Sequence, residues 1–183
     1  MDNKSVKDIC EECVKDNELI KACNKFVLEV ARLLGEQESL PKDANADAMF
    51  EYVQNRNGWT TCDKKTAVSK AEQGSFVLGV ANTELRKTAE PKATKGHVVV
   101  IVGGGLSTNG KEKLADGSEQ GRLGGYPYCY QGSELKKYQF HRITSVDVVF
   151  HSKIKDKITY AYKNRQTISK AEFKAFTQAL GRA

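Results

Sequence analysis

The sequence predicts an α+β domain in which N-terminal helices pack on a mostly antiparallel sheet of about five strands. Before residue 75, apolar residues recur at helical spacing, whereas after it they gather in short β-branched runs between glycine-rich or polar stretches. Helices that precede the strands, rather than alternate with them, are typical of the α+β class. A length of 183 residues suits one domain with its own core, so we assign residues 1–183 to a single domain.

The helical pattern is strongest in the first part of the chain. The spacing predicts three helices there, at residues 19–34, 43–54 and 63–73. The first of them is followed by Gly35, where a left-handed C-cap is wanted. Residues 1–18 are polar and are expected to form a short helix or an ordered arm. A Ser-Lys-Ala-Glu capping box predicts one more helix, over residues 169–180.

Strand patterns occupy most of the chain after residue 75. Five strands are predicted, at residues 75–80, 96–103, 126–131, 145–150 and 157–162. The strongest reads GHVVVIVG, and because it does not alternate we expect it to be buried on both faces. Residues 103–125 contain eight glycines and few apolar residues, which predicts a flexible loop or a hairpin insertion. No helical pattern follows its first glycines, so a phosphate-binding loop is not indicated.

Composition limits the classes of function. The chain is 39% hydrophobic and 28% charged, and no apolar run approaches the roughly 18 residues that span a membrane. The N-terminus lacks the apolar stretch of a signal peptide, so we expect synthesis in the cytoplasm and any export by another route. The net charge of +6 indicates either a simple lysine excess or attraction to a polyanion such as nucleic acid, a membrane surface or the bacterial wall. The lysines are spread out and no arginine-rich stripe occurs, which argues against nucleic acid.

Five cysteines raise the questions of metal and disulfides. Cys10 and Cys13 resemble half a zinc site, but no second CxxC or spaced histidine pair completes it. In an oxidising compartment, one or two disulfides could form among four of the cysteines, namely Cys10, Cys13, Cys62 and Cys129. The pairing is not fixed by the sequence. Cys23 would remain as the odd, free thiol.

Cys23 and His97 suggest a cysteine hydrolase. Cys23 lies near the first turn of a predicted helix, where the positive end of the helix dipole favours thiolate, although it could equally be a core cysteine on the apolar stripe. His97 begins the strongest strand and could serve as the base, or could be a strand-end histidine satisfied by backbone groups. The other two histidines, His141 and His151, lie in more polar settings typical of a surface.

A third group would orient the imidazole. The strand after that of His97 offers Gln131, Tyr128 and Tyr130, depending on register. Gln131 could accept from the imidazole N–H, but it cannot stabilise an imidazolium as a carboxylate would. Asp147 is the nearest carboxylate on a later predicted strand, where it also fits a solvated position. The backbone N–H of Cys23 is expected to be among the oxyanion donors.

Several stretches together resemble a known family. They are the Cys-x-x-Phe-Val motif with the rest of its helix at 23–35, and the segments 44–49, 71–78, 96–103 and 126–133. In this order and approximate spacing the chain resembles the NlpC-type and CHAP papain-like cysteine peptidases of bacterial cell-wall metabolism, and more specifically the type VI secretion amidase effectors of the first Tae family. The resemblance covers residues from Cys23 to about Tyr162.

This resemblance implies a papain-like fold with its core at about residues 17–162. It implies hydrolysis of a peptidoglycan stem-peptide amide, between D-glutamate and meso-diaminopimelate, with Cys23 as nucleophile, His97 as base and Gln131 in the third position. It also implies delivery by the type VI apparatus into a rival's periplasm and a cognate immunity protein that blocks the cleft. We expect a monomer that needs no cofactor or metal, binds no nucleic acid and does not insert into membranes.

The chain departs from this family in several places. Asn24 and Lys25 replace the usual Ser-Gly after the nucleophile, and Gln131 stands where a cysteine is usual. The loop at 103–125 and the tail after Tyr162 are longer than expected. Two other hypotheses therefore stay open: a papain-like hydrolase that acts on protein isopeptide or acyl substrates, and a non-catalytic wall-binding module in which Cys23 is structural.

Overall fold

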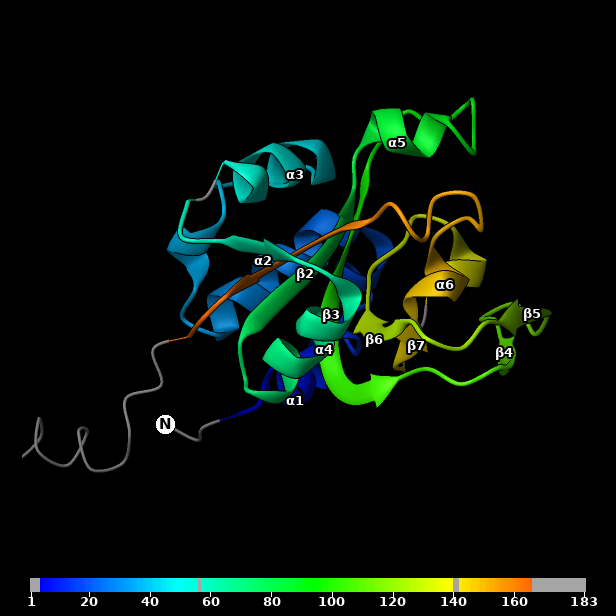
Figure 1. The fold of residues 1–183 in the computed structure, drawn as a ribbon, viewed down its shortest axis with the longest axis horizontal. Coiled ribbons are helices and arrows are strands. Elements are labelled where there is room, and N and C mark those ends of the chain that lie inside the picture. Colours follow the sequence, from blue (N-terminus) through cyan, green and yellow to red (C-terminus); the bar gives the residue numbers. More distant parts are fainter. Residues whose placement is uncertain (1–3, 56, 140–141, 166–183) are drawn as a thin grey trace, which may run out of the picture.

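The computed structural model describes residues 4–55, 57–139 and 142–165. The predicted helix at 169–180 lies outside these ranges. The described residues form an α+β structure with a six-stranded sheet in the order β1-β8-β2-β3-β6-β7, and each strand pair in it is antiparallel. This confirms the predicted class, with one more strand than expected (Figure 1).

The helices have the following bounds: α1 (Val6–Cys13), α2 (Cys23–Leu33), α3 (Ala46–Gln54), α4 (Lys64–Glu72), α5 (Thr83–Lys87) and α6 (Val146–Val149). Short 3-10 turns cover η1 (Leu19–Lys21), η2 (Gln37–Ser39) and η3 (Lys136–Tyr138). The strands are β1 (Thr60–Cys62), β2 (Phe76–Ala81), β3 (His97–Leu106), β4 (Gly110–Lys113), β5 (Glu119–Arg122), β6 (Pro127–Tyr130), β7 (Thr144–Ser145) and β8 (Thr159–Lys163).

Strand β3 is the centre of the core. Val98 and Val100 pack with α1, α2 and α3, whereas Val99 and Ile101 pack with α4 and the segment around α6. Figure 1 shows α4 in front of the sheet and α1 and α2 behind it. The predicted burial of this strand on both faces is therefore confirmed, and it explains why its residues do not alternate between apolar and polar.

The start of the second helix differs from the prediction. Residues 19–21 form the separate turn η1, Ala22 is extended with φ −142° and ψ 116°, and α2 begins at Cys23. The carbonyl of Ala22 accepts from the Phe26 N–H, which makes Ala22 the N-cap. Cys23 is therefore the first residue of the helix rather than a residue one turn inside a longer one.

The predicted strand at 145–150 is wrong over most of its length. Only Ser145 belongs to a strand, and the following residues form α6. The Asp147 carboxylate accepts from the Ser145 hydroxyl at 2.5 Å, and such a local bond favours a turn over a ladder. It also accepts from the N–H of Leu123, which lies 24 positions away in the sequence. Val146 and Val148 are still buried, and a short apolar run does not by itself distinguish a strand from a buried helix.

The glycine-rich stretch at 103–125 forms a hairpin insertion, one of the two structures expected of it. Strand β3 continues to Leu106, and β4 then pairs with β5 in a two-stranded sheet of its own. Glu112, only 6% exposed, fixes this hairpin through ion pairs with Arg122 at 3.1 Å and Arg142 at 3.3 Å. Figure 1 shows the hairpin projecting beyond the edge of the main sheet.

All five cysteines are free thiols in this structure. Cys10, Cys13 and Cys129 are buried in the core, and Cys62 is half-buried on β1. The possible disulfides considered above are therefore not formed. No helix among the described residues is long and apolar enough to cross a lipid bilayer.

Candidate active site

Cys23 occupies the first position of α2, and its side chain is half-buried. The first N–H groups of a helix have no partner within the helix, so they are available to a thiolate or to an oxyanion beside the sulfur. No side chain caps α2. The next residue, Asn24, donates from Nδ2 to the Ala44 carbonyl at 3.2 Å and so ties this turn to the segment that precedes α3.

Gly132, just after β6, packs closely against the turn that precedes Cys23. A Cβ atom at this position would lie 2.6 Å from the Leu19 carbonyl oxygen and 2.7 Å from that of Ala22. The next residue, Ser133, donates its N–H to the Ile20 carbonyl at 2.7 Å. The chain can pass this close only because Gly132 has no side chain, and this contact brings the end of β6 next to the turn that precedes Cys23.

His97 is the first residue of β3 and pairs with Ala81 at the end of β2. Its ring is half-buried and meets the ring of the buried Phe150 edge-on, with centroids 5.4 Å apart and planes at 66°. Phe150 follows α6, so the segment that was predicted as a strand supplies the wall behind the imidazole. Nothing in the sequence pattern pointed to this contact.

Gln131 follows β6 and is 1% exposed. Its Oε1 lies 2.5 Å from Nε2 of His97, and its Nε2 donates to the Tyr138 carbonyl at 3.3 Å. Because a carbonyl can only accept, the amide nitrogen must face Tyr138 and the amide oxygen must face His97. His97 Nε2 therefore carries a proton, and in the neutral ring Nδ1 is the nitrogen left to act as a base.

Cys23 and His97, 74 positions apart in the sequence, interact directly. Burial disfavours the thiolate, but the charge of His97 and a hydrogen bond from it, with backbone N–H groups of Val98 and Asn24, hold the pKa of Cys23 below its ordinary value. The other four thiols behave differently, because burial raises the pKa of each: Cys13 to about 12, Cys62 to about 11, and Cys10 and Cys129 as well. Cys23 is the thiol activated by its surroundings.

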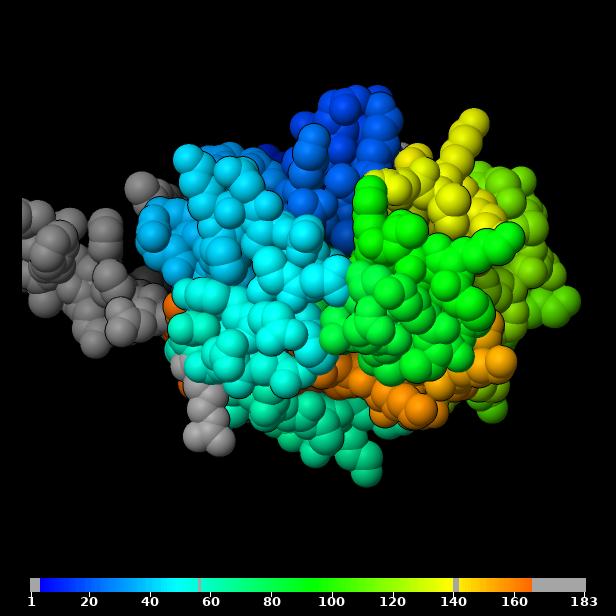
Figure 2. Space-filling model, turned by 90° about the horizontal axis from the view of Figure 1, so that it is seen from above, coloured from blue at the N-terminus to red at the C-terminus, as the bar shows by residue number. Residues whose placement is uncertain are grey.

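Four segments converge around these residues: the turn before α2, the start of α3, the loop that carries α5, and the segment after β6. Figure 2 shows them together on one face, in blue, cyan, green and yellow. Two of these segments are joined by an ion pair between Lys95 and Glu134 at 2.7 Å, and both side chains are about two-thirds exposed. Glu134, and to a smaller extent Cys23, raise the pKa of Lys95, so this cation lies close to the thiol.

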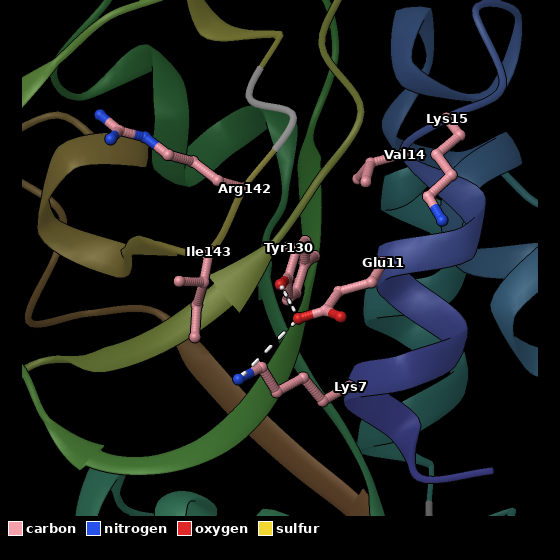
Figure 3. A pocket seen from close by; sticks show the side chains of 7 residues that line it. All are labelled: Lys7, Glu11, Val14, Lys15, Tyr130, Arg142 and Ile143. Atoms are coloured by element: carbon pink, nitrogen blue, oxygen red, sulfur yellow. Dashed lines mark hydrogen bonds and ion pairs between the residues drawn. The ribbon is translucent and has the colours of Figure 1, made fainter.

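Two cavities lie elsewhere. One, of about 420 Å³, lies between α1 and β6 (Figure 3), where the Tyr130 hydroxyl donates to Glu11 at 3.1 Å and Lys7 lies 3.8 Å from the same carboxylate. Another, of about 450 Å³, lies beside β1 and β8 and is lined partly by Cys62. Neither contains Cys23, His97 or Gln131. The half-buried thiol and imidazole thus lie apart from both cavities.

Three of the other predicted candidates, Tyr130, Asp147 and His151, have their partners outside the site. Tyr130 bonds to α1, Asp147 is used in the turn around α6, and His151 is exposed and accepts from the Lys153 N–H. His141 lies outside the described residues. Within the described part of the chain, no group of three or more His, Cys, Asp or Glu side chains could hold a metal ion.

Comparison of the chain with models of protein families and with curated proteins gave no match. Covalent acyl transfer requires a nucleophile, a base and a group that orients the base. A thiol of lowered pKa, an imidazole beside it and a buried amide that fixes the imidazole have the chemistry for these three roles.

Proposed function

We propose that this protein is a cysteine hydrolase of papain-like fold that cleaves an amide bond in the peptide stems of peptidoglycan. The observation that carries the proposal is the arrangement of Cys23, the first residue of a helix packed on the sheet, beside His97, whose Nε2 lies 2.5 Å from Gln131 Oε1. The lowered pKa of Cys23 agrees with it. A papain-like cysteine hydrolase requires a nucleophile at the start of such a helix and a base on the central strand.

The reaction proceeds in two steps. The Cys23 thiolate attacks the amide carbonyl carbon, the carbonyl oxygen becomes an oxyanion near the backbone N–H groups at the start of α2, and His97 gives a proton to the leaving nitrogen as the C–N bond breaks. Water then loses a proton to His97 and its oxygen attacks the thioester. The C–S bond breaks and leaves a carboxylic acid and the thiolate.

Gln131 keeps the imidazole in one orientation throughout. Its amide is buried and held by the Tyr138 carbonyl, so the imidazole Nε2–H has a fixed partner. Because the amide is neutral, it orients the ring without compensating the charge of the imidazolium. The thiolate of Cys23 supplies the opposite charge before the reaction begins.

Peptidoglycan is proposed as the substrate on the strength of the five ordered stretches and of the charge. A net charge of +6 favours adsorption to the anionic bacterial wall. The resemblance specifies the bond from D-glutamate to meso-diaminopimelate, delivery by the type VI apparatus into a recipient's periplasm, and an immunity protein that covers the cleft. A monomer is sufficient for this chemistry, because nucleophile, base and orienting group all come from one chain.

A papain-like hydrolase of protein isopeptide or acyl substrates is the second candidate. It would use the same Cys23 and His97, so only the substrate separates it from the first. A non-catalytic wall-binding module fits less well. A structural thiol is expected to resemble Cys10 or Cys129, which burial keeps protonated, and Cys23 does not.

The test is to incubate purified peptidoglycan with the protein and analyse the soluble fragments by mass spectrometry. We expect fragments that end in D-glutamate, and none with Cys23→Ala or His97→Ala. Cys62→Ala, which removes a half-buried thiol on β1, is the matched control and should cleave like the wild type. Fragments from Cys23→Ala would overturn the mechanism. A wild type that labels rapidly at Cys23 but releases nothing would favour the isopeptide or acyl substrate.

A further inference from the structure

The residue before His97 has no free space around it. A Cβ atom on Gly96 would lie 2.8 Å from the Ala81 carbonyl oxygen, and 3.1 Å from both Ala46 Cβ and Asp47 Oδ1. The backbone that leads into His97 is therefore pressed between the end of β2 and the first turn of α3. Any movement of this backbone would move the imidazole.

Of the three residues nearest to Gly96, Asp47 carries a charged side chain. Three hydrogen bonds are donated to its carboxylate. The Thr83 N–H donates to Oδ1 at 2.5 Å, the Thr83 hydroxyl donates to Oδ2 at 2.6 Å, and the Gly96 N–H donates to Oδ2 at 3.3 Å. Burial opposes ionisation, but these bonds hold the pKa of Asp47 below its ordinary value. The carboxylate thus joins three separate segments: α3, the start of α5 and the strand that carries His97.

We propose that Asp47 is a positioning residue for His97. It acts through its hydrogen bond from the Gly96 N–H. By fixing the backbone one residue before the imidazole, it sets the approach of the ring to Cys23. Other bonds complete the support of this loop, since Arg86 Nη1 donates to the Lys95 carbonyl at 2.8 Å and Lys95 pairs with Glu134.

Asp47→Asn tests the role with little change of shape. If the new amide keeps its oxygen toward the Thr83 N–H, its NH₂ group replaces Oδ2, and the Gly96 N–H then faces a donor instead of an acceptor. The matched control is Asp63→Asn. Asp63 also accepts from a threonine N–H, that of Thr66 at 2.8 Å, but it begins α4, on the opposite face of the sheet from α2.

The measurement is the rate of Cys23 alkylation by iodoacetamide against pH, together with the thermal unfolding midpoint. With Asp47→Asn we expect the alkylation midpoint to rise and the rate at pH 7 to fall about tenfold, because a displaced His97 stabilises the thiolate less. Asp63→Asn should keep the wild-type midpoint. An Asp47→Asn protein whose unfolding midpoint falls while its alkylation profile stays unchanged would show that Asp47 is merely structural.

Thr83→Val covers the case in which Asp47→Asn does not fold. Thr83→Val removes one of the three bonds to Asp47 but leaves the Gly96 N–H its acceptor, so we expect a smaller rise of the alkylation midpoint. If Asp47→Asn is unfolded and Thr83→Val keeps the wild-type alkylation profile, the proposal is overturned. His97→Ala separates this proposal from the proposed function. If His97→Ala alkylates like the wild type, the activated thiol itself is refuted. If only His97→Ala is shifted, the site stands and the role of Asp47 fails.

Discussion

Gln131 Oε1 lies 2.5 Å from Nε2 of His97, and the amide is held from its other side by the Tyr138 carbonyl. In the proposed reaction the ring becomes charged, and a hydrogen bond to a charged group is worth roughly 1.5–3 kcal/mol, or about 10- to 100-fold in rate. The residue lies at a position where a carboxylate would also stabilise the imidazolium. Substitutions of Gln131 can therefore separate the effect of orienting the His97 ring from the effect of stabilising its positive charge.

Gln131→Ala should lower kcat about 10- to 100-fold with little change in KM, because the ring loses its fixed orientation while the substrate surface stays. Gln131→Glu restores an acceptor and should recover more of the activity than alanine. Steady-state rates on a stem-peptide substrate measure both. The role assigned to Gln131 would be wrong if the alanine variant, shown to be folded by circular dichroism, turned over at the wild-type rate.

The reactivity of Cys23 should depend on pH in a distinctive way. The pKa of Cys23 is lowered, so its alkylation should reach half of the maximal rate below the value of about 8.5 expected for a free cysteine. His97→Ala removes the opposite charge and leaves the burial, so the midpoint should rise. At pH 7 the wild type should label first at Cys23, as peptide mapping would show. Equal labelling of Cys62 would contradict this.

The same shift has a consequence for stability. A thiol whose pKa is lower in the folded state stabilises the fold fully above its unfolded pKa, and this contribution disappears as the pH falls through the folded pKa. The unfolding free energy of the wild type relative to Cys23→Ala should therefore increase with pH within that window. Urea titrations across the window would measure it, and a constant difference between the two proteins would contradict the lowered pKa.

Cys23, His97 and Gln131 could be found from sequence because each leaves a local signal. Cys23 lies at the start of an amphipathic helix, His97 opens the most β-branched run, and Gln131 ends the next strand. Their order along the chain limits how the elements can meet. Helical spacing, β-branched runs and caps also predicted α2, α3 and α4 and the strands β2, β3, β6 and β8. Gly35 and Gly74 both have positive φ just after α2 and α4.

The features that were missed depend on contacts between distant segments. Ala22 is extended where the chain passes Gly132, and the local spacing, which continues through Ala22, does not show this contact. Asp147 turns its segment into α6 through a bond from the remote Leu123 N–H. Strand β1 is polar and largely exposed, so it lacks the apolar pattern by which strands are recognised.

Gly132 offers a test of how tightly the two halves of the site are joined. In Gly132→Ala, the new Cβ would lie within 2.8 Å of backbone atoms of Leu19 and Ala22, so the turn before Cys23 has to move. We expect a loss of roughly 1–3 kcal/mol in unfolding free energy and a slower alkylation of Cys23.

Gly121→Ala is the matched control for this substitution. Gly121 lies in β5 of the insertion hairpin, and a Cβ there meets nothing within 4 Å. It should change neither stability nor alkylation. If Gly132→Ala were less stable but Cys23 were alkylated at the wild-type rate across the pH range, the close approach at Gly132 would contribute to stability and not to the reactivity of Cys23.

Attraction to the bacterial wall should be electrostatic and therefore sensitive to salt. The lysines that give the net charge of +6 are spread along the chain, and screening shortens the range of such charges from about 10 Å at 0.1 M salt to about 3 Å at 1 M. Sedimentation of the Cys23→Ala protein with intact peptidoglycan carrying its anionic polymers separates adsorption from cleavage. The bound fraction should fall steadily as salt is raised. Peptidoglycan stripped of those polymers is the control and should bind less at low salt. Adsorption that is equal on both materials and insensitive to salt would mean that charge contributes nothing to wall binding.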